Sequence, residues 1–213
     1  MRFLKNFFGS VKKTESPAGG TVLGTLLQAK EAIDTENVVT LESLLRKHPS
    51  LGEELDDLGW SLLHYAVAHY KLQSIARMLS CGLNVNISTK NGNCTPLFFA
   101  CAGNGPIEMA QLLIEHGADV NWRDEEGGTA LHAAANHNRT DLITLLIAKG
   151  SEVNVKRKAD GWTPLHCADN LETVKLLIEK GANSAARDRC RRTRMDIARG
   201  AKQNDIAEFL QRL

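Results

Sequence analysis

One short phrase recurs along this chain at nearly constant intervals. It reads Thr-Pro-Leu-His-Cys-Ala at residues 163–168, and versions of it begin at residues 61, 95, 129 and 193. The starting positions are separated by 34, 34, 34 and 30 residues. A fixed period of this size indicates an array of small units in which each unit packs only on its neighbours. The chain therefore has no single central core to be found.

Pairs of apolar residues repeat independently of that phrase. Their second members are 34, 34, 33, 31 and 33 residues apart: Leu45, Leu79, Leu113, Leu146, Leu177 and Leu210. The pattern predicts six units, each with two helices joined by a short polar turn. Most second helices are followed by a glycine, the residue that best adopts the left-handed conformation just past a helix end. These glycines are Gly82, Gly117, Gly150 and Gly181.

The phrase and the period resemble the ankyrin repeat family, whose Thr-Pro-Leu-His-x-Ala signature recurs about every 33 residues. The match is close at residues 117–134 and 163–166, and the resemblance covers roughly residues 21–213. It implies an all-α solenoid of about six helix-turn-helix units with β-hairpin loops. The expected divisions are a capping unit at 21–55, repeats at about 56–88, 89–122, 123–155 and 156–186, and a C-terminal capping repeat at 187–213.

Physical reasons support the recurring residues. Threonine is suited to cap the helix that follows it, and proline fits the first helical turn, where its missing N–H is not needed. The next position is apolar throughout and predicts a buried ladder: Leu63, Leu97, Leu131, Leu165 and Met195. His64, His132 and His166 recur at one place in the phrase, which indicates a structural position.

Several units depart from the regular pattern. The unit beginning at Thr163 is about three residues short near residues 169–172, close to one helical turn. Hairpins near 90–93 and 156–158 are one residue longer than their neighbours, and 103–106 predicts an expanded turn. In the last unit Arg194 replaces the proline, so its first turn is expected to be less well defined. Polar residues there are expected to keep the outer face soluble: Arg194, Arg199, Lys202, Gln203 and Asn204.

Stacked units present a continuous concave surface to partners. Resemblance to ankyrin proteins places the contacts at the hairpin tips, just before the threonine, and at the end of the first helix. The corresponding residues are Leu58, Trp60, His69, Lys90, Asn104, Arg123, Glu125, Glu126, Asn136, His137, Arg157, Asp160, Trp162, Asn170, Arg189 and Arg191. The expected function is a non-enzymatic adaptor that binds an unidentified protein partner.

Two features of this surface leave alternatives open. Tryptophan is a common interface anchor, so Trp60 and Trp162 are either contacts or packing residues against a neighbouring hairpin. Arginine and lysine are concentrated late in the chain, although the whole chain has 26 basic against 25 acidic residues. That asymmetry favours a partner with acidic segments, the alternative being a solvated cap. Nucleic acid ranks below a protein partner because aromatic residues do not alternate with the basic ones.

Catalytic and metal sites are not predicted. His166 and Cys167 are adjacent, but sequence neighbours on a helix point in different directions. His132 and His137 are five residues apart, which does not match the i, i+4 spacing of a helical metal pair. There is no glycine-rich phosphate loop. We therefore expect no enzyme activity, cofactor or metal.

Residues 1–20 stand outside the periodic region and predict a flexible basic, amphipathic segment. Its apolar residues share one helical face with lysines around it, so residues 1–13 provide an alternative function as a membrane-surface anchor. A frayed tail is the competing interpretation. Five scattered cysteines, without a Cys-x-x-Cys pair, suit a reducing compartment, so we expect a cytoplasmic monomer.

Overall fold

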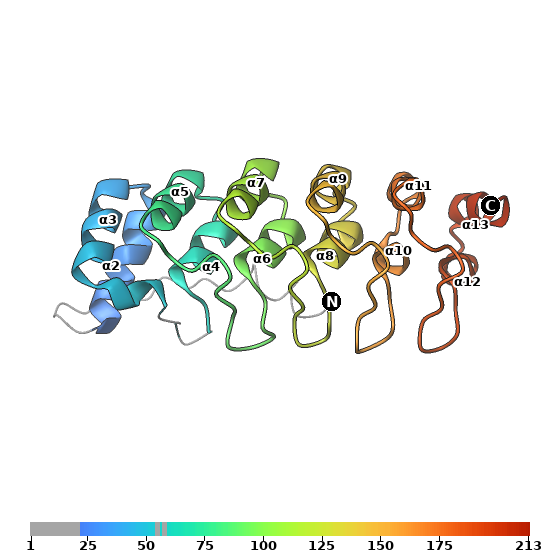
Figure 1. Ribbon diagram of the computed structural model, residues 1–213, viewed down its shortest axis with the longest axis horizontal. Coiled ribbons are helices and arrows are strands. Elements are labelled where there is room, and N and C mark those ends of the chain that lie inside the picture. The colour runs from blue at the N-terminus through green and yellow to red at the C-terminus, as the bar shows by residue number, and fades with distance from the viewer. Residues whose placement is uncertain (1–21, 54–55, 57–58) are drawn as a thin grey trace.

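The computed structural model describes residues 22–53, 56 and 59–213, which form six helix pairs stacked in one row (Figure 1). The first, inner helices are α2 (Val22–Asp34), α4 (Leu62–Ala68), α6 (Pro96–Ala102), α8 (Ala130–Asn136), α10 (Pro164–Cys167) and α12 (Arg194–Gly200). The second, outer helices are α3 (Val38–Lys47), α5 (Leu72–Ser80), α7 (Ile107–Glu115), α9 (Thr140–Ala148), α11 (Leu171–Glu179) and α13 (Asn204–Gln211). A short 3-10 helix, η1, spans Pro49–Gly52. The predicted all-α solenoid is confirmed. The N-terminal segment 1–20 lies outside the described residues.

A hydroxyl residue begins most inner helices, as the phrase predicts. Thr129 is the N-cap residue of α8. Its backbone N–H donates to Nδ1 of His132 at 3.2 Å, and its hydroxyl lies 3.0 Å from the same nitrogen. This is a capping box in which histidine takes the place usually held by glutamate or glutamine. The same arrangement recurs at residues 61–64 and 163–166.

The predicted leucine ladder forms the centre of the packing. Leu63, Leu97, Leu131 and Leu165 are at most 1% exposed, whereas Met195 in the last unit is half-buried. Alanines fill the space between neighbouring inner helices, and every alanine of α8 is buried. Small side chains let α6, α8 and α10 lie close together, so the core continues from unit to unit.

Glycines end four outer helices in the predicted left-handed conformation. Their φ angles are 85° at Gly82, 88° at Gly117, 92° at Gly150 and 91° at Gly181. The carbonyl groups of the last three accept side-chain amide hydrogen bonds from the preceding unit, each at 3.0 Å. The three donors form an asparagine ladder: Asn86, Asn121 and Asn154.

The predicted β-hairpins are tight turns rather than strands in the part of the chain that the structure describes. One backbone hydrogen bond closes each turn. The closed turns span 56–60, 89–94, 124–128, 157–162 and 188–192. The second and fourth are one residue longer than the others, as predicted.

The irregular unit loses its residues from the inner helix. Helix α10 has four residues, whereas α4, α6, α8 and α12 have seven each. Helix α11 keeps nine residues, so the outer row of the stack is uninterrupted. The expanded turn is also present, since four residues join α6 to α7, against three between α8 and α9.

Arg194 corrects two expectations about the last unit. Its side chain is 2% exposed, so it does not help to keep the outer face soluble. Its Nε donates to the carbonyl of Ala168 at 2.8 Å, just beyond the shortened α10. The first turn of α12 is well defined, because Thr193 and Asp196 form a capping box there. The side chain of Arg194 thus provides a hydrogen bond at the point where α10 ends three residues earlier than the other inner helices.

Candidate partner-binding surface

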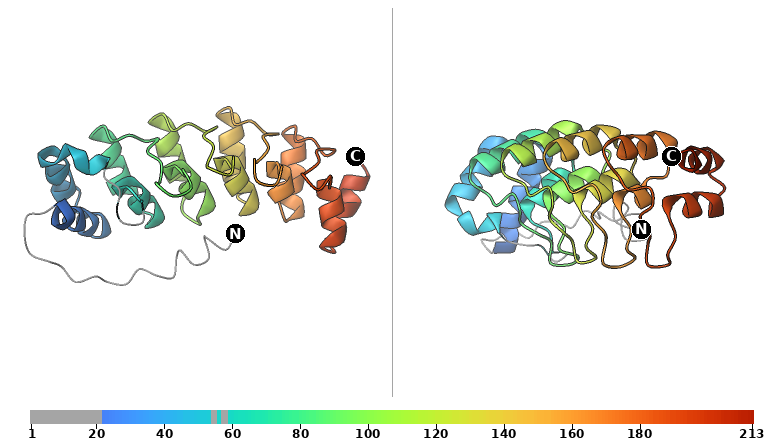
Figure 2. Two further views of the ribbon diagram at one scale, coloured as in Figure 1. Left: turned by 90° about the horizontal axis from the view of Figure 1, so that it is seen from below. Right: turned by 45° about the vertical axis from the view of Figure 1, so that its right-hand side comes forward.

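The turns at 89–94, 124–128, 157–162 and 188–192 project from one side of the helix stack and form a row along the array (Figures 1 and 2). We call them fingers 2 to 5, in chain order, and we call the described part of the first turn, Asp56 with residues 59–60, finger 1. Backbone hydrogen bonds link each finger to the one before it at 2.6–3.1 Å. The donor and acceptor residues are Lys90 and Gly59, Glu125 and Gly92, Lys158 and Glu126, and Arg189 and Asp160. The finger tips therefore have a fixed spacing.

Glycine allows the close approach of neighbouring fingers. Gly127 in finger 3 has a φ of 79°, and a Cβ atom there would lie 2.8 Å from the backbone nitrogen of Lys158. A larger residue would be strained in conformation and would push the two fingers apart.

The predicted contact residues differ in exposure. Leu58 lies outside the described residues. The exposed members are Lys90, Asn104, Arg123, Glu125, Glu126, Asn170, Arg189 and Arg191. The half-buried members are His69, Asn136, His137, Arg157, Asp160 and Trp162. Trp60 is buried.

Trp60 is part of the packing between two units. Its side chain is 8% exposed, and its ring centroid lies 4.8 Å from that of Phe99 in α6. The structure therefore supports the packing alternative for Trp60. We leave it out of the candidate surface because a partner has little access to its ring.

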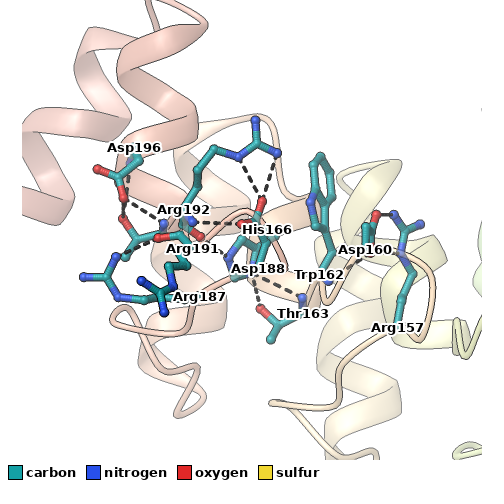
Figure 3. Close-up of polar contacts among 11 residues, drawn as sticks. Arg157, Asp160, Trp162, Thr163, His166, Arg187, Asp188, Arg191, Arg192 and Asp196 are labelled. Carbon is teal, nitrogen blue, oxygen red and sulfur yellow. Dashed lines mark hydrogen bonds and ion pairs between the residues drawn. The ribbon is translucent and has the colours of Figure 1, made fainter.

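Trp162 belongs to a preformed cluster on finger 4 (Figure 3). The guanidinium carbon of Arg157 lies 5.5 Å from the indole centroid, and Arg157 also forms an ion pair with Asp160. The carboxylate of Asp160 accepts the backbone N–H of Trp162 at 2.9 Å. Burial alone would raise the pKa of Asp160, but the hydrogen bond from Arg157 holds it below its ordinary value. One face of the indole is thus covered by a charged group.

Finger 5 combines one buried carboxylate with several arginines (Figure 3). Asp188 accepts the backbone N–H of Arg192 at 2.8 Å and pairs with its guanidinium at 2.9 Å. Arg187 donates to the carbonyl of Arg191 at 2.6 Å. Arg189 and Arg191 are exposed and have no side-chain hydrogen bond or ion pair with any described residue. Their guanidinium groups are free to meet a partner.

Some of the predicted contact residues at the ends of the inner helices also stabilise the fold. Asn170 accepts the backbone N–H of Thr173 at 2.7 Å and so caps α11. The ring of His69 stacks on Tyr65 with centroids 4.1 Å apart. The hydroxyl of Tyr65 donates to Asp34 at 2.8 Å. Substitution of these residues would therefore alter the fold as well as the surface.

The recurring histidines are structural. Nε2 of His64, His132 and His166 lies 3.0, 3.1 and 3.3 Å from a carbonyl oxygen of the following finger. Burial lowers the pKa of His64 and of His132 to about 4, and it also lowers the pKa of His166. Each ring is thus a neutral link between a helix start and the next finger.

The cysteine thiols are poor nucleophiles where they are enclosed. Burial raises the pKa values of Cys94, Cys101 and Cys167 to about 12. The Nδ1 atom of His166 is occupied by Thr163, so it is not available to deprotonate Cys167. All five cysteines are free, and Cys81 and Cys190 are exposed.

Among the described residues, no three His, Cys, Asp or Glu side chains are grouped to hold a metal ion. Among the helices described, none has the length and apolar character needed to span a bilayer.

Comparison with known proteins agrees with the architecture. A model of three ankyrin repeat copies matches residues 29–124 and again residues 102–188. The chain belongs to the ankyrin repeat family. Human ankyrin repeat and SOCS box protein 3 is 32% identical over 158 residues, which is 71% of this chain and 30% of that protein. Ankyrin repeat protein OPG189 of Variola virus is 29% identical over 157 residues, 69% of this chain and 27% of the viral protein.

A further ankyrin relative comes from yeast. The target of rapamycin complex 2 subunit AVO2 of Saccharomyces cerevisiae is 29% identical over 161 residues, 73% of this chain and 37% of that protein. The chain thus aligns with only about a third, or less, of each relative. Ankyrin repeats are general protein–protein interaction modules, and the family is typically non-enzymatic.

Two residues of this ankyrin repeat array make contacts that the sequence did not specify. The indole N–H of Trp122 donates to the carbonyl of Asn93 at 3.0 Å, which links finger 2 to the segment that leads into finger 3. In the unit that contains Asn93, Phe98 replaces the histidine of the phrase. No sequence signal revealed the burial of Arg194, because its acceptor lies 26 residues away.

Proposed function

We propose that this chain is a non-enzymatic adaptor module that binds a protein partner through the concave face formed by the fingers and the inner-helix ends. The main support is the row of finger tips, which hydrogen bonds hold at fixed spacing while exposed charged side chains project from it. A preorganised surface loses little conformational freedom on binding. The yeast relative is named as a subunit of target of rapamycin complex 2, which is consistent with such a role.

The chemistry of the described residues supports the non-enzymatic part of the proposal. The most regular polar residues, the histidines of the phrase, have both ring nitrogens engaged by the scaffold. The buried thiols have raised pKa values. Free cysteines throughout the chain favour a reducing, cytoplasmic location.

A charge swap on the fingers tests the proposal. Lys90→Glu combined with Glu126→Lys keeps the net charge and alters only exposed side chains. The matched control is Lys149→Glu with Glu115→Lys, which changes exposed positions at the ends of two outer helices. Proteins captured by the wild-type chain are identified by mass spectrometry, and their recovery by each variant is measured.

We expect the finger variant to lose recovery about tenfold or more and the control to retain it. Circular dichroism checks that both variants remain folded. Equal recovery by both variants, or loss in the control alone, would contradict binding through the fingers. Deletion of residues 1–20 should leave capture unchanged, whereas the membrane-anchor alternative requires that deletion to abolish liposome binding.

A further inference from the structure

Fingers 4 and 5 carry an excess of positive charge that the scaffold does not neutralise. These two fingers, together with the residue that precedes each of them, contain seven basic and two acidic side chains in residues 156–162 and 187–192. Both acidic side chains are already paired within their own finger, Asp160 with Arg157 and Asp188 with Arg192. The five remaining cations form no salt bridge with a described residue: Lys156, Lys158, Arg187, Arg189 and Arg191. Of these, only Arg187 is near enough to a described carboxylate, that of Asp196, to lower its pKa.

These cations lie close together because the two fingers are joined. The backbone N–H of Arg189 donates to the carbonyl of Asp160 at 2.8 Å, and Nζ of Lys156 donates to the carbonyl of Arg187 at 2.7 Å. Figure 3 shows Arg187, Arg191 and Arg192 on one side of Trp162 and Arg157 on the other. Arginine presents a planar set of donors that matches a carboxylate well. The chain as a whole has a net charge of +1, so this concentration is local.

The adjoining finger has the opposite charge. Glu125 and Glu126 of finger 3 are exposed, and neither makes a side-chain ion pair with a described residue. Arg123 is paired with Glu152 at 3.2 Å and so does not offset them. The exposed charge along the row therefore changes from negative on finger 3 to positive on fingers 4 and 5.

This order favours a short peptide over a nucleic acid. A phosphate backbone that continued along the row would meet the carboxylates of finger 3. The aromatic ring nearest the basic fingers, Trp162, is covered on one face by Arg157, which hinders base stacking. A protein segment can carry acidic residues opposite fingers 4 and 5 and basic residues opposite finger 3, whereas every nucleotide of a nucleic acid is negatively charged.

We propose that the partner contributes an extended segment with ordered charges, basic residues facing finger 3 and acidic residues facing fingers 4 and 5. The inference rests on the proposed function and specifies the chemistry of the partner. Stacked helices lie about 8–10 Å apart, and an extended chain rises about 3.3 Å per residue. Each finger therefore faces about three residues, which predicts a basic block of about three residues and an acidic block of about six.

Synthetic peptides test this order directly. The probe is a fluorescein-labelled peptide of three lysines followed by six glutamates, and the comparison peptide has the same residues in alternating order. Binding to the full chain is measured by fluorescence anisotropy at low and at physiological salt. We expect the ordered peptide to bind on the order of tenfold more tightly than the alternating one. The affinity should fall with added salt because exposed charges are screened.

Charge reversals assign the effect to the fingers. Lys158→Glu with Arg189→Glu should weaken binding of the ordered peptide by on the order of tenfold or more. Lys47→Glu with Lys149→Glu makes the same change in net charge at exposed ends of outer helices and should change binding by less than about twofold. Glu125→Lys with Glu126→Lys should abolish the preference for the ordered peptide over six glutamates alone.

Other results would overturn the inference. Equal weakening by the finger and outer-helix reversals would mean that only net charge matters. Tighter binding of a single-stranded oligodeoxythymidine than of the ordered peptide would indicate a nucleic-acid surface instead. If proteins captured through the fingers are unaffected by Lys158→Glu with Arg189→Glu, the charge-ordered segment is wrong while the proposed adaptor function stands.

Discussion

The histidine of the recurring phrase shows how a single side chain joins two units. A backbone N–H can only donate and a carbonyl can only accept, so Thr129 N–H and Trp162 O together require His132 to be neutral, with its proton on Nε2. Protonation of Nδ1 would remove the acceptor for Thr129. The same constraint holds at His64, between Ser61 and Cys94.

Acid should therefore weaken the fold through these histidines. Their folded-state pKa values, about 4, lie below the ordinary value of 6.5, so the unfolded chain binds more protons between those limits. The stabilisation is complete above pH 6.5 and is lost as the pH falls towards 4. We expect the free energy of unfolding to decrease by roughly 3 kcal/mol for each histidine across this range. Urea denaturation at a series of pH values measures the decrease.

The chain provides its own control for this prediction. Phe98 occupies the histidine position in the unit that begins at Thr95. His132→Phe should lower stability at pH 7 by about 1–3 kcal/mol, because Thr129 N–H and Trp162 O lose their partner. The variant should also be less sensitive to acid than the wild type. An unchanged pH profile in His132→Phe would show that this ring does not titrate on unfolding.

At the scale of elements, the shortened α10 and the buried arginine of the next unit form one arrangement. Arg194 Nε donates to the carbonyl of Ala168, and Nη2 donates to Gln203 at 2.7 Å. Gln203 donates in turn to the carbonyl of Asp169 at 2.8 Å. These side chains lie next to the C-terminal end of α10 and donate hydrogen bonds to the backbone carbonyl groups that follow it.

The shortening of α10 and the replacement of proline by Arg194 should therefore be energetically coupled. Inserting three helix-favouring residues after Cys167 restores the length of α10 but places the new turn where Arg194 lies, so the insertion should destabilise the chain by about 2 kcal/mol or more. Arg194→Pro restores the usual phrase but removes the hydrogen bond to Ala168, at a cost of similar size. Combined, the changes should cost at least about 1 kcal/mol less than their sum.

Urea denaturation of the four proteins gives the coupling energy. Strict additivity of the two effects would show that α10 and Arg194 changed independently. As a control, Arg199→Pro alters an exposed arginine of the same helix and should show no rescue by the insertion.

At the scale of the whole molecule, the junctions between neighbouring units are held by different contacts. Three junctions contain the histidine hydrogen bond to the following finger, but α6 carries Phe98 and cannot make it. Fingers 2 and 3 are instead linked by Trp122 and by Asn93, whose amide donates to the carbonyl of Arg123 at 3.2 Å. In a linear array each such junction contributes separately to the stability of the whole.

Loss of the indole N–H should therefore open this junction first. Trp122→Phe retains the aromatic ring and removes the bond to Asn93, at a cost of about 1 kcal/mol. Hydrogen exchange followed by mass spectrometry should show faster exchange in fingers 2 and 3 than in finger 5. Adding Phe98→His should slow that exchange again by supplying the usual link. Uniform acceleration along the chain would contradict a local junction.

Much of this fold follows from local patterns. The helix starts, the left-handed glycines and the leucine ladder each depend on residues within one unit. The sequence of one repeat is therefore enough to predict them. Exposure at the surface depended on contacts between units. Trp60 packs on Phe99, 39 positions later, and Arg194 reaches back to Ala168, and neither distance is marked by the period. The charge of the fingers could be predicted from the sequence, but the ion pairs of Asp160 with Arg157 and of Asp188 with Arg192 could not.

The arrangement around α10 also limits how this array can gain or lose repeats. A regular repeat can be duplicated or deleted because both of its faces fit any neighbour. The unit with α10 has one irregular face, and Arg194 and Gln203 of the following unit supply hydrogen bonds to it. We therefore expect a chimaera that separates the last two units to be less stable than one in which they are transferred together.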